Sequence, residues 1–403
     1  MQSQPRPERI VHFIIKISKL CNLRCKYCYE MPELANRDAM SLDQLDRMYL
    51  HIAEHYGALE EPTRLVMVWH GGEPLLQQPD FYWRTFERQQ KIFQGFSRLR
   101  VENVVQTNLT VLDEERLRLL RDGFSAVGVS IDLFGGLRVN LAGRDAEERV
   151  LQNMDRLNEA GIPYGGITVL TRLNRPHVKR IYRFYESMSL PFRLLPIFPG
   201  AFEDQHAGFG IDAAEVLAAF REVVDLWLES DKYIAVIPID GHIREVLLHL
   251  TEGAPTTFYD RRRWETAVMV NTSGDVFGYP EAYDPAYCYG NVFTTPLGQL
   301  FASPNREKSL KAAETRMALS CIKCPYFGAC SGYHMAEDNR RYDDAVRDGN
   351  ALCVVEKNLL AHIERRLKES GLSSANAGDT TDRLALDALT RPAHDNQALA
   401  FPA

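Results

Sequence analysis

The first half of the chain alternates short apolar runs with longer amphipathic stretches, and this alternation limits the folds it can adopt. Each apolar run has the length of a buried β-strand, and a stretch with helical periodicity follows it. Repeated strand–helix units favour a parallel sheet with right-handed crossovers. The predicted strands are His12–Ile17, Leu65–Trp69, Leu99–Val105, Ala126–Ile131, Gly165–Leu170 and Phe192–Phe198.

The stretches between these strands carry helix start and stop signals. Ser41 and Gln44 have the spacing of a capping box, and Gly123 and Gly161 stand where glycine commonly ends a helix. Six strand–helix units are fewer than the eight of a closed barrel, so we expect an α/β fold with an open (β/α)6 partial TIM barrel. The other predicted helices are Asp80–Phe93, Asp113–Asp122, Asp145–Ala160, Arg175–Met188 and Asp212–Leu228.

Three cysteines follow the first predicted strand in the pattern C-x3-C-x2-C: Cys21, Cys25 and Cys28. Iron–sulfur clusters normally have four cysteine ligands, so three close thiolates can hold a [4Fe–4S] cluster and leave one iron open. A zinc site is the alternative, but structural zinc prefers four ligands in paired knuckles, and no fourth ligand follows nearby. Three cysteines are an odd number, so they cannot all pair with one another, and the sequence lacks a secretory signal. Both points disfavour disulfides in this loop.

This run resembles the signature of the radical SAM superfamily, in which S-adenosylmethionine (SAM) binds the open iron. The resemblance rests on the cysteine spacing, on the Asn-Leu-Arg after Cys21 and on Tyr27 before the last cysteine. It implies the open partial barrel, and it places the cluster at the carboxyl end of the first strand, where barrel enzymes place their chemistry.

The resemblance also implies a set of SAM contacts at the ends of later strands. The Gly-Gly-Glu stretch would hold the methionyl amino group of SAM, a serine and a downstream arginine would lie near its carboxylate, and a tyrosine would flank the adenine. Arg138 competes with Arg144 for the arginine role. The alternatives are a simple turn, a solvated surface arginine and a tyrosine that only packs on the cysteine loop. The implied contacts are Tyr27, Gly71, Gly72, Glu73, Thr107, Asn108, Ser130 and Arg144.

A second cysteine group follows late in the chain. Its C-x2-C-x5-C spacing and one further downstream cysteine resemble the SPASM domain of radical SAM peptide and protein maturases. The resemblance implies that these four residues hold one auxiliary [4Fe–4S] cluster, with a zinc ribbon as the alternative. The predicted auxiliary ligands are Cys321, Cys324, Cys330 and Cys353.

SPASM domains typically hold a second auxiliary cluster, and its ligands are incomplete in this sequence. No cysteine follows the Gly274-Asp-Val turn, and His334 stands where the family has a further cysteine. Only Cys288 remains unassigned, so we expect two clusters in total. The expected organisation is a radical SAM core at 10–232, a SPASM-like domain at 233–370 with a helix over Asn350–Lys368, and a mobile tail at 371–403.

The resemblance points to a maturase of ribosomally made precursor peptides that acts through a 5′-deoxyadenosyl radical. The stretches around His70 and Val129–Gly143 resemble maturases that crosslink an aromatic side chain to a nearby β-carbon, giving a cyclophane. Epimerisation is an alternative, with Cys288 as hydrogen donor, although a buried structural thiol is the simpler interpretation of Cys288. Oxidation of a sulfatase Cys or Ser and a non-catalytic iron–sulfur electron carrier are further alternatives. No catalytic side chain is predicted outside the epimerase alternative.

The expected partners are a precursor peptide and a reducing protein of the flavodoxin or ferredoxin type. About ten residues precede the first strand, so we expect leader binding to use a separate protein, the barrel or the SPASM-like region. The net charge of −7 disfavours a nucleic-acid partner. The sequence lacks an apolar run long enough for a membrane span and a signal core, which predicts a cytoplasmic protein without a membrane partner.

Overall fold

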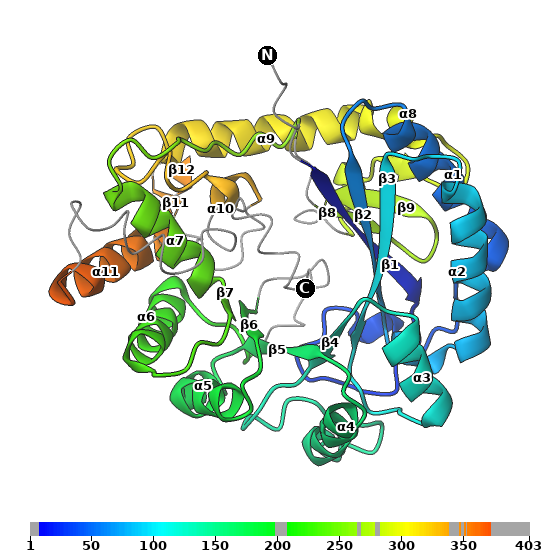
Figure 1. The fold of residues 1–403 in the computed structure, drawn as a ribbon, viewed down its shortest axis with the longest axis horizontal. Coiled ribbons are helices and arrows are strands. Elements are labelled where there is room, and N and C mark those ends of the chain that lie inside the picture. The colour runs from blue at the N-terminus through cyan, green and yellow to red at the C-terminus, as the bar shows by residue number, and fades with distance from the viewer. Residues whose placement is uncertain are drawn as a thin grey trace.

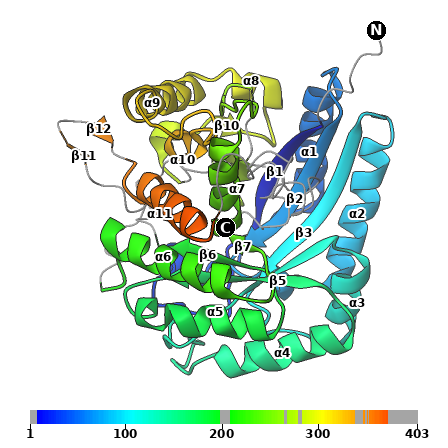
Figure 2. The same cartoon turned by 60° about the vertical axis from the view of Figure 1, so that its left-hand side comes forward.

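A computed structural model describes residues 8–197, 208–263, 267–278, 283–337, 346–347, 350–351 and 353–371. Its main feature is a curved, ten-stranded sheet with helices along its outer face (Figures 1 and 2). All six predicted strands occur, and neighbouring strands among them pair in parallel. These strands are β1 (Arg9–Ser18), β2 (Thr63–Gly71), β3 (Leu99–Thr107), β4 (Ala126–Ser130), β5 (Tyr164–Leu170) and β6 (Phe192–Pro196).

The order β1-β2-β3-β4-β5-β6 follows the sequence, as expected when each crossover helix returns the chain to the adjacent position. The predicted open partial barrel is therefore confirmed. Phe198, the last residue of the sixth predicted strand, lies outside the described residues.

The six predicted helices also occur, with small shifts at their starts. The capping box is confirmed, because the Ser41 hydroxyl accepts from the backbone of Gln44 while the Gln44 side chain accepts from the backbone of Ser41. The fifth helix begins later than predicted, since the segment Arg175–His177 forms a separate 3-10 turn. The helices are α1 (Leu42–Gly57), α2 (Pro79–Phe93), α3 (Glu114–Asp122), α4 (Glu147–Glu159), α5 (Val178–Ser187) and α6 (Ala213–Glu229).

Both faces of the sheet are buried, as is usual for a parallel sheet covered by helices. Phe13 and Ile15 of β1 belong to the large core that lies between the sheet and the helices. Ile14 points the other way, because successive side chains of a strand alternate between faces. It joins a smaller apolar cluster with Val66 and Val68 of β2 on the inner face of the barrel.

The chain after residue 233 extends this sheet at both ends. β7 pairs with β6, and β8 pairs in parallel with β1 before β9 and β10 continue the sheet in antiparallel fashion. The predicted helix over Asn350–Lys368 begins only at Val355, because Asn350–Ala351 pairs with a short strand. These elements are β7 (Val236–Ile237), α7 (Ile239–Leu250), β8 (Ala267–Val270), β9 (Asp275–Gly278), β10 (Gly290–Asn291), α8 (Leu297–Phe301), α9 (Pro304–Ser320), α10 (Tyr333–Ala336), β11 (Val346–Arg347), β12 (Asn350–Ala351) and α11 (Val355–Glu369).

The C-terminal helix α11 packs against α6 and α7. The predicted mobile tail, apart from residue 371, lies outside the described residues.

Candidate functional site

The three N-terminal cysteines lie in a loop at the carboxyl end of β1. Backbone hydrogen bonds hold this loop: Cys21 donates to Leu34 O (3.1 Å) and Cys28 donates to Cys25 O (2.9 Å). Burial raises the pKa of Cys21 and of Cys28 to about 12, and it also raises the pKa of Cys25. Such thiols are protonated at neutral pH, so a metal that binds them must displace their protons.

The predicted glycine pair at the end of β2 lies against this loop. Gly72 N donates to Ser18 O (2.8 Å), and a Cβ added to Gly72 would come within 2.3 Å of Leu20 O. Gly71 has a φ of +134°, which side chains rarely adopt. The close approach of two backbone segments therefore requires a glycine at Gly72, and the positive φ favours one at Gly71.

Glu73 follows the glycines and is fully buried between β2 and β3. Its carboxylate accepts hydrogen bonds from Thr107 Oγ1 (2.7 Å), Asn108 N (2.7 Å) and Leu75 N (2.8 Å). Burial raises the pKa of Glu73, and these three hydrogen bonds oppose the shift. The Asn108 amide nitrogen also lies 3.7 Å from the Cys21 sulfur. The structure thus brings Glu73, Thr107 and Asn108 together beside the first cysteine.

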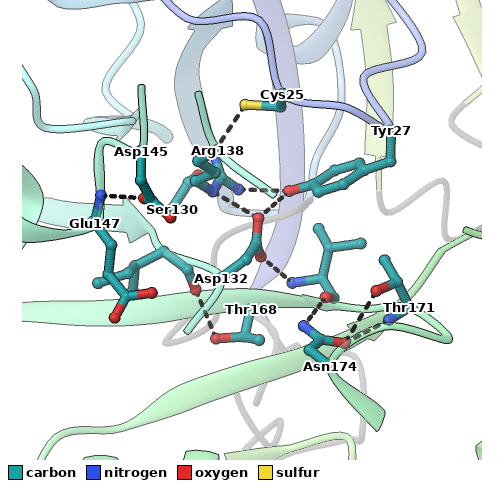
Figure 3. A network of polar contacts seen from close by, with 12 residues as sticks. Cys25, Tyr27, Ser130, Asp132, Arg138, Asp145, Glu147, Thr168, Thr171 and Asn174 are labelled. Carbon is teal, nitrogen blue, oxygen red and sulfur yellow. Dashed lines mark hydrogen bonds and ion pairs between the residues drawn. The ribbon is translucent and has the colours of Figure 1, made fainter. Parts of the chain in front are cut away.

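Tyr27 belongs to a buried polar network at the end of β4 (Figure 3). Arg138 forms an ion pair with Asp132 (Nε–Oδ2 2.7 Å), donates to Tyr27 OH (2.9 Å) and lies 3.8 Å from the Cys25 sulfur. The Tyr27 hydroxyl in turn donates to Asp132. The carboxylate of Asp132 also accepts from Val169 N (2.7 Å), which ties the network to β5. The network therefore fixes the orientation of Arg138 beside the cysteine loop.

The sequence left Arg138 and Arg144 as alternatives for the arginine near the SAM carboxylate, and the two differ in burial and position in the structure. The Arg138 side chain is 11% exposed and contacts the cysteine loop, whereas Arg144 is exposed, and its backbone forms the turn with Asn140. Asp132 was not predicted as a site residue. The signal that could have identified it is its position two residues after Ser130 at the end of the fourth strand.

Ser130 faces a neighbouring strand end rather than a charged group. The Gln106 amide nitrogen donates to the Ser130 hydroxyl (2.6 Å). The other amide atom, Gln106 Oε1, is buried and has no hydrogen-bond partner among the residues that the structure describes, and buried polar atoms are rarely left in that state. A ligand with a donor group would satisfy this oxygen.

A second buried network, which the sequence argument missed, lies on the inner face of the barrel. Lys16 is 2% exposed; its ammonium group forms an ion pair with Glu30 (3.1 Å) and contacts Tyr29 OH (2.5 Å) and His70 Nδ1 (3.2 Å). Burial and the charge of Lys16 hold the pKa of His70 well below its usual value. His70 is therefore neutral, and its Nδ1 accepts a hydrogen bond from Gly71 N (2.8 Å).

The four late cysteines line one pocket, together with His334 and Glu356. Cys321 and Cys324 follow the end of α9, whereas the other two cysteines precede α10 and α11. Burial raises the pKa of Cys321 to about 11. The four predicted auxiliary ligands Cys321, Cys324, Cys330 and Cys353 are thus brought together, although they are far apart in the sequence.

Cys288 lies apart from both cysteine groups. It lies two residues before β10, its thiol points toward Gly290 O (3.8 Å), and it packs against the apolar cluster on the inner face of the barrel. Burial raises its pKa.

The sequence model of the Radical SAM superfamily matches residues 15–185, the region that supplies β1 to β5 and the first cysteine loop. The chain contains a radical SAM domain. Enzymes with this domain use SAM and a [4Fe–4S] cluster, and the donor set fits both: three thiols in one loop for the cluster, and the unsatisfied Gln106 Oε1 for a SAM donor group.

Curated relatives extend the similarity beyond the radical SAM domain. The serine-type anaerobic sulfatase-maturating enzyme of Bacteroides thetaiotaomicron is 24% identical over 373 residues, covering 86% of this chain and 87% of the relative. The cysteine-type anaerobic sulfatase-maturating enzyme of Clostridium perfringens strain 13 is 22% identical and covers 77% and 85%, respectively. Both alignments cover more of this chain than the radical SAM match does.

Solved structures share the fold over most of the chain. Native anSMEcpe with bound AdoMet superposes with a TM-score of 0.68 at 17% identity and covers 90% of this chain and 98% of its own. Streptococcus suis SuiB bound to precursor peptide SuiA superposes with a TM-score of 0.55 at 15% identity, covering 82% and 74%. Within the described residues, no helix is both long and apolar enough to cross a bilayer.

Proposed function

We propose that this radical SAM enzyme is a maturase that modifies a peptide or a protein segment after hydrogen abstraction. One structural observation carries the proposal: a three-cysteine loop beside strand ends with buried polar side chains occurs in the same chain as a separate pocket of four cysteines. The similarity to sulfatase-maturating enzymes over both regions supports it. The proposed organisation is a radical SAM core at 10–232 and a SPASM-like auxiliary domain at 233–370.

In the proposed site, Cys21, Cys25 and Cys28 hold the cluster that binds SAM. When bound, the cluster and SAM supply the hydrogen-abstracting 5′-deoxyadenosyl radical. The protein positions SAM and excludes water, which reactive intermediates require. The depth of the cysteine loop supports this role, because Cys21 is buried under the Gly-Gly-Glu stretch.

We assign the amino group of SAM to Glu73. An ionised carboxylate offers about four acceptor positions, and three of them are used by Thr107, Asn108 and Leu75. One position remains for a cationic amine beside Cys21. Glu73→Gln should therefore weaken SAM binding while the iron content stays unchanged; equal SAM affinity in equilibrium dialysis would remove Glu73 from the site.

We assign the carboxylate of SAM to Arg138 and Ser130, and we prefer Arg138 to Arg144. A guanidinium fork suits a carboxylate, and Asp132 and Tyr27 already orient the Arg138 group beside Cys25. The Tyr27 ring lies near Arg138 and remains the proposed neighbour of the adenine. Arg144 is exposed on the turn beyond this network.

We further propose one auxiliary [4Fe–4S] cluster, held by Cys321, Cys324, Cys330 and Cys353. Such a cluster can accept the electron that a substrate radical releases when it forms a new bond. A reducing protein of the flavodoxin or ferredoxin type would reduce the cluster that binds SAM. The lining of the pocket supports the ligand set, since the four sulfur-bearing side chains face one space.

The preferred reaction is oxidative crosslinking of side chains in a ribosomally made peptide. The test is co-expression with a peptide encoded beside the gene, followed by mass spectrometry. A crosslink removes two hydrogen atoms and protects the ring between the joined residues from fragmentation. An unmodified peptide, in the presence of confirmed SAM cleavage, would contradict crosslinking of that peptide.

Oxidation of a serine or cysteine on a protein substrate is the second candidate, because the relatives that align with most of the chain are sulfatase-maturating enzymes. Serine oxidation also removes two hydrogen atoms, so mass alone does not separate it from a crosslink. The product of oxidation is an aldehyde, which reacts with a hydrazide probe, whereas a carbon–carbon crosslink does not. Hydrazide labelling of the modified peptide would therefore reverse the order of these two candidates.

Epimerisation with Cys288 as hydrogen donor gives a third pattern. The product keeps its mass in H2O and gains one deuterium in D2O. Cys288 packs among apolar side chains on the inner face of the barrel, which supports a structural role. Crosslinking therefore requires that Cys288→Ala retains activity; loss of a deuterium-labelled product in a folded Cys288→Ala variant would identify the epimerase.

A further inference from the structure

Two histidines and a glutamate meet beside the four-cysteine pocket, on residues that neither cysteine group uses. His242 and Glu245 are one turn apart on α7, so they face the same side of that helix. Residue His334 approaches them from α10. One potential ligand atom from each of the three residues lies within 4.8 Å of the other two. His242 Nδ1 is 3.0 Å from Glu245 Oε2, and the His242 and His334 ring centroids are 4.8 Å apart.

Two members of this group are buried, and the third, His334, is partly exposed. The Glu245 side chain is 3% exposed and that of His242 is 2% exposed. Glu356, at the start of α11, adds a second buried carboxylate, 3.9 Å from His334 Nδ1. Buried carboxylates are costly unless they are paired or bind a metal. A divalent cation bound between the two imidazoles and the Glu245 carboxylate would be such a metal.

We propose that His242, Glu245 and His334 form a mononuclear zinc site, separate from the iron–sulfur clusters. Imidazole nitrogen and carboxylate oxygen are zinc ligands, with metal–ligand distances of about 2.0–2.2 Å. The 3.0 Å between His242 Nδ1 and Glu245 Oε2 is a separation that neighbouring ligands of one ion adopt. Glu356 is the fourth candidate ligand, or it orients His334 from outside the coordination shell.

The position of the site defines its structural role. The three proposed ligands join α7, which follows the barrel, to α10. Glu356 adds α11, and both α10 and α11 frame the four-cysteine pocket. His334 and Glu356 line that pocket themselves. A zinc ion at this point would link the segment that carries Cys330 to α7, so its loss should loosen the pocket without touching a cysteine.

The first experiment is metal analysis of the full-length chain, purified and reconstituted anaerobically, with one equivalent of zinc chloride added before desalting. We expect one zinc per chain in addition to the iron. The zinc X-ray absorption spectrum should contain a nitrogen and oxygen shell at about 2.0–2.2 Å and lack a sulfur shell at about 2.3 Å. Absence of bound zinc, or a zinc ion surrounded by sulfur, would overturn the proposal; the second result would place the ion on the cysteines.

Variants then assign the ligands. His242→Ala and Glu245→Gln should each reduce bound zinc about tenfold or more, because a site loses affinity when a ligand is removed. His249→Ala is the matched control on the same helix and should keep its zinc. Cys324→Ala should lose auxiliary iron and keep zinc.

Equal zinc in His242→Ala, Glu245→Gln and His249→Ala would overturn the proposal and leave a buried histidine–glutamate ion pair in its place. Glu245→Gln preserves side-chain shape, so it remains informative if the alanine variant does not fold. The wild-type absorption spectrum needs no variant at all.

Discussion

The two cysteine pockets are formed by different kinds of secondary structure. The first lies on the carboxyl ends of parallel strands, where the pairing of β1 with β2 and of β2 with β3 fixes the positions of Cys21 and Glu73. The second is framed by the ends of α9, α10 and α11 and by the loops between them. Strand ends in a covered sheet hold groups to the tolerance that catalysis needs, whereas we expect a pocket made of helix ends and loops to depend more on the cluster that we propose there.

The largest expected effect is the loss of the first cluster. With two [4Fe–4S] clusters, the reconstituted chain should hold about eight irons. Replacing Cys21, Cys25 and Cys28 together with alanine should abolish SAM cleavage and leave about half of the iron. Iron analysis and chromatography of 5′-deoxyadenosine measure the two quantities. About twelve irons in the wild type would instead indicate a third cluster.

Removal of cysteines from the second pocket should have the opposite pattern of effects on SAM cleavage. Cys324→Ala combined with Cys353→Ala should remove about half of the iron, keep SAM cleavage and abolish product formation. It should also make the C-terminal region more sensitive to proteolysis, because we expect the proposed cluster to stabilise that pocket. A variant that retains full product formation would show that the second pocket is not needed for the reaction.

A third prediction compares the two arginines near the first pocket. Arg138→Ala breaks a buried ion pair with Asp132, so it should destabilise the apoprotein by about 3–5 kcal/mol. Arg144→Ala removes an exposed side chain and should change stability by about 0.5 kcal/mol or less. Denaturant unfolding measures both, and SAM affinity should fall only in the Arg138 variant. The same loss of affinity in both would restore Arg144 to the site.

The smallest effect tests the backbone contact under the first pocket. Gly72→Ala places a Cβ within 2.3 Å of the Leu20 carbonyl, so we expect a cost of about 1–3 kcal/mol and a displaced cysteine loop. Gly95→Ala, where no atom lies within 4 Å of the added Cβ, is the control and should be neutral or slightly stabilising. Reduced cluster loading in Gly72→Ala alone supports the contact; equal loading in both variants argues against it.

The contrast between regular strands and irregular loops also explains which elements could be predicted from the sequence. The six barrel strands were predicted because their apolar runs are long and bounded by turns, and the capping residue Ser41 fixed the start of α1. β8 was missed, since a strand of four residues carries little periodic signal. α9 was missed because its buried residues, Ser309, Leu310 and Ala313, do not form a long apolar stripe.

Within the site, motif residues were predictable and their partners were not. Cys21 and Glu73 belong to local patterns, so the sequence alone was enough to propose them as site residues. The choice of Arg138 over Arg144 depends on Asp132, which pairs with it only after β4 and the following loop have folded. Likewise, Lys16 and His70 come from different strands and meet only through the register of β1 with β2.

We expect only the first of the two cysteine pockets to bind SAM. The most direct test is the electron paramagnetic resonance spectrum of the dithionite-reduced protein before and after SAM is added, in two variants. The spectrum of Cys324→Ala/Cys353→Ala, which keeps the first pocket, should shift on addition of SAM. That of the variant with Cys21, Cys25 and Cys28 replaced by alanine should contain a cluster signal that SAM does not alter. A SAM-dependent shift in the second variant, or none in the first, would contradict the account.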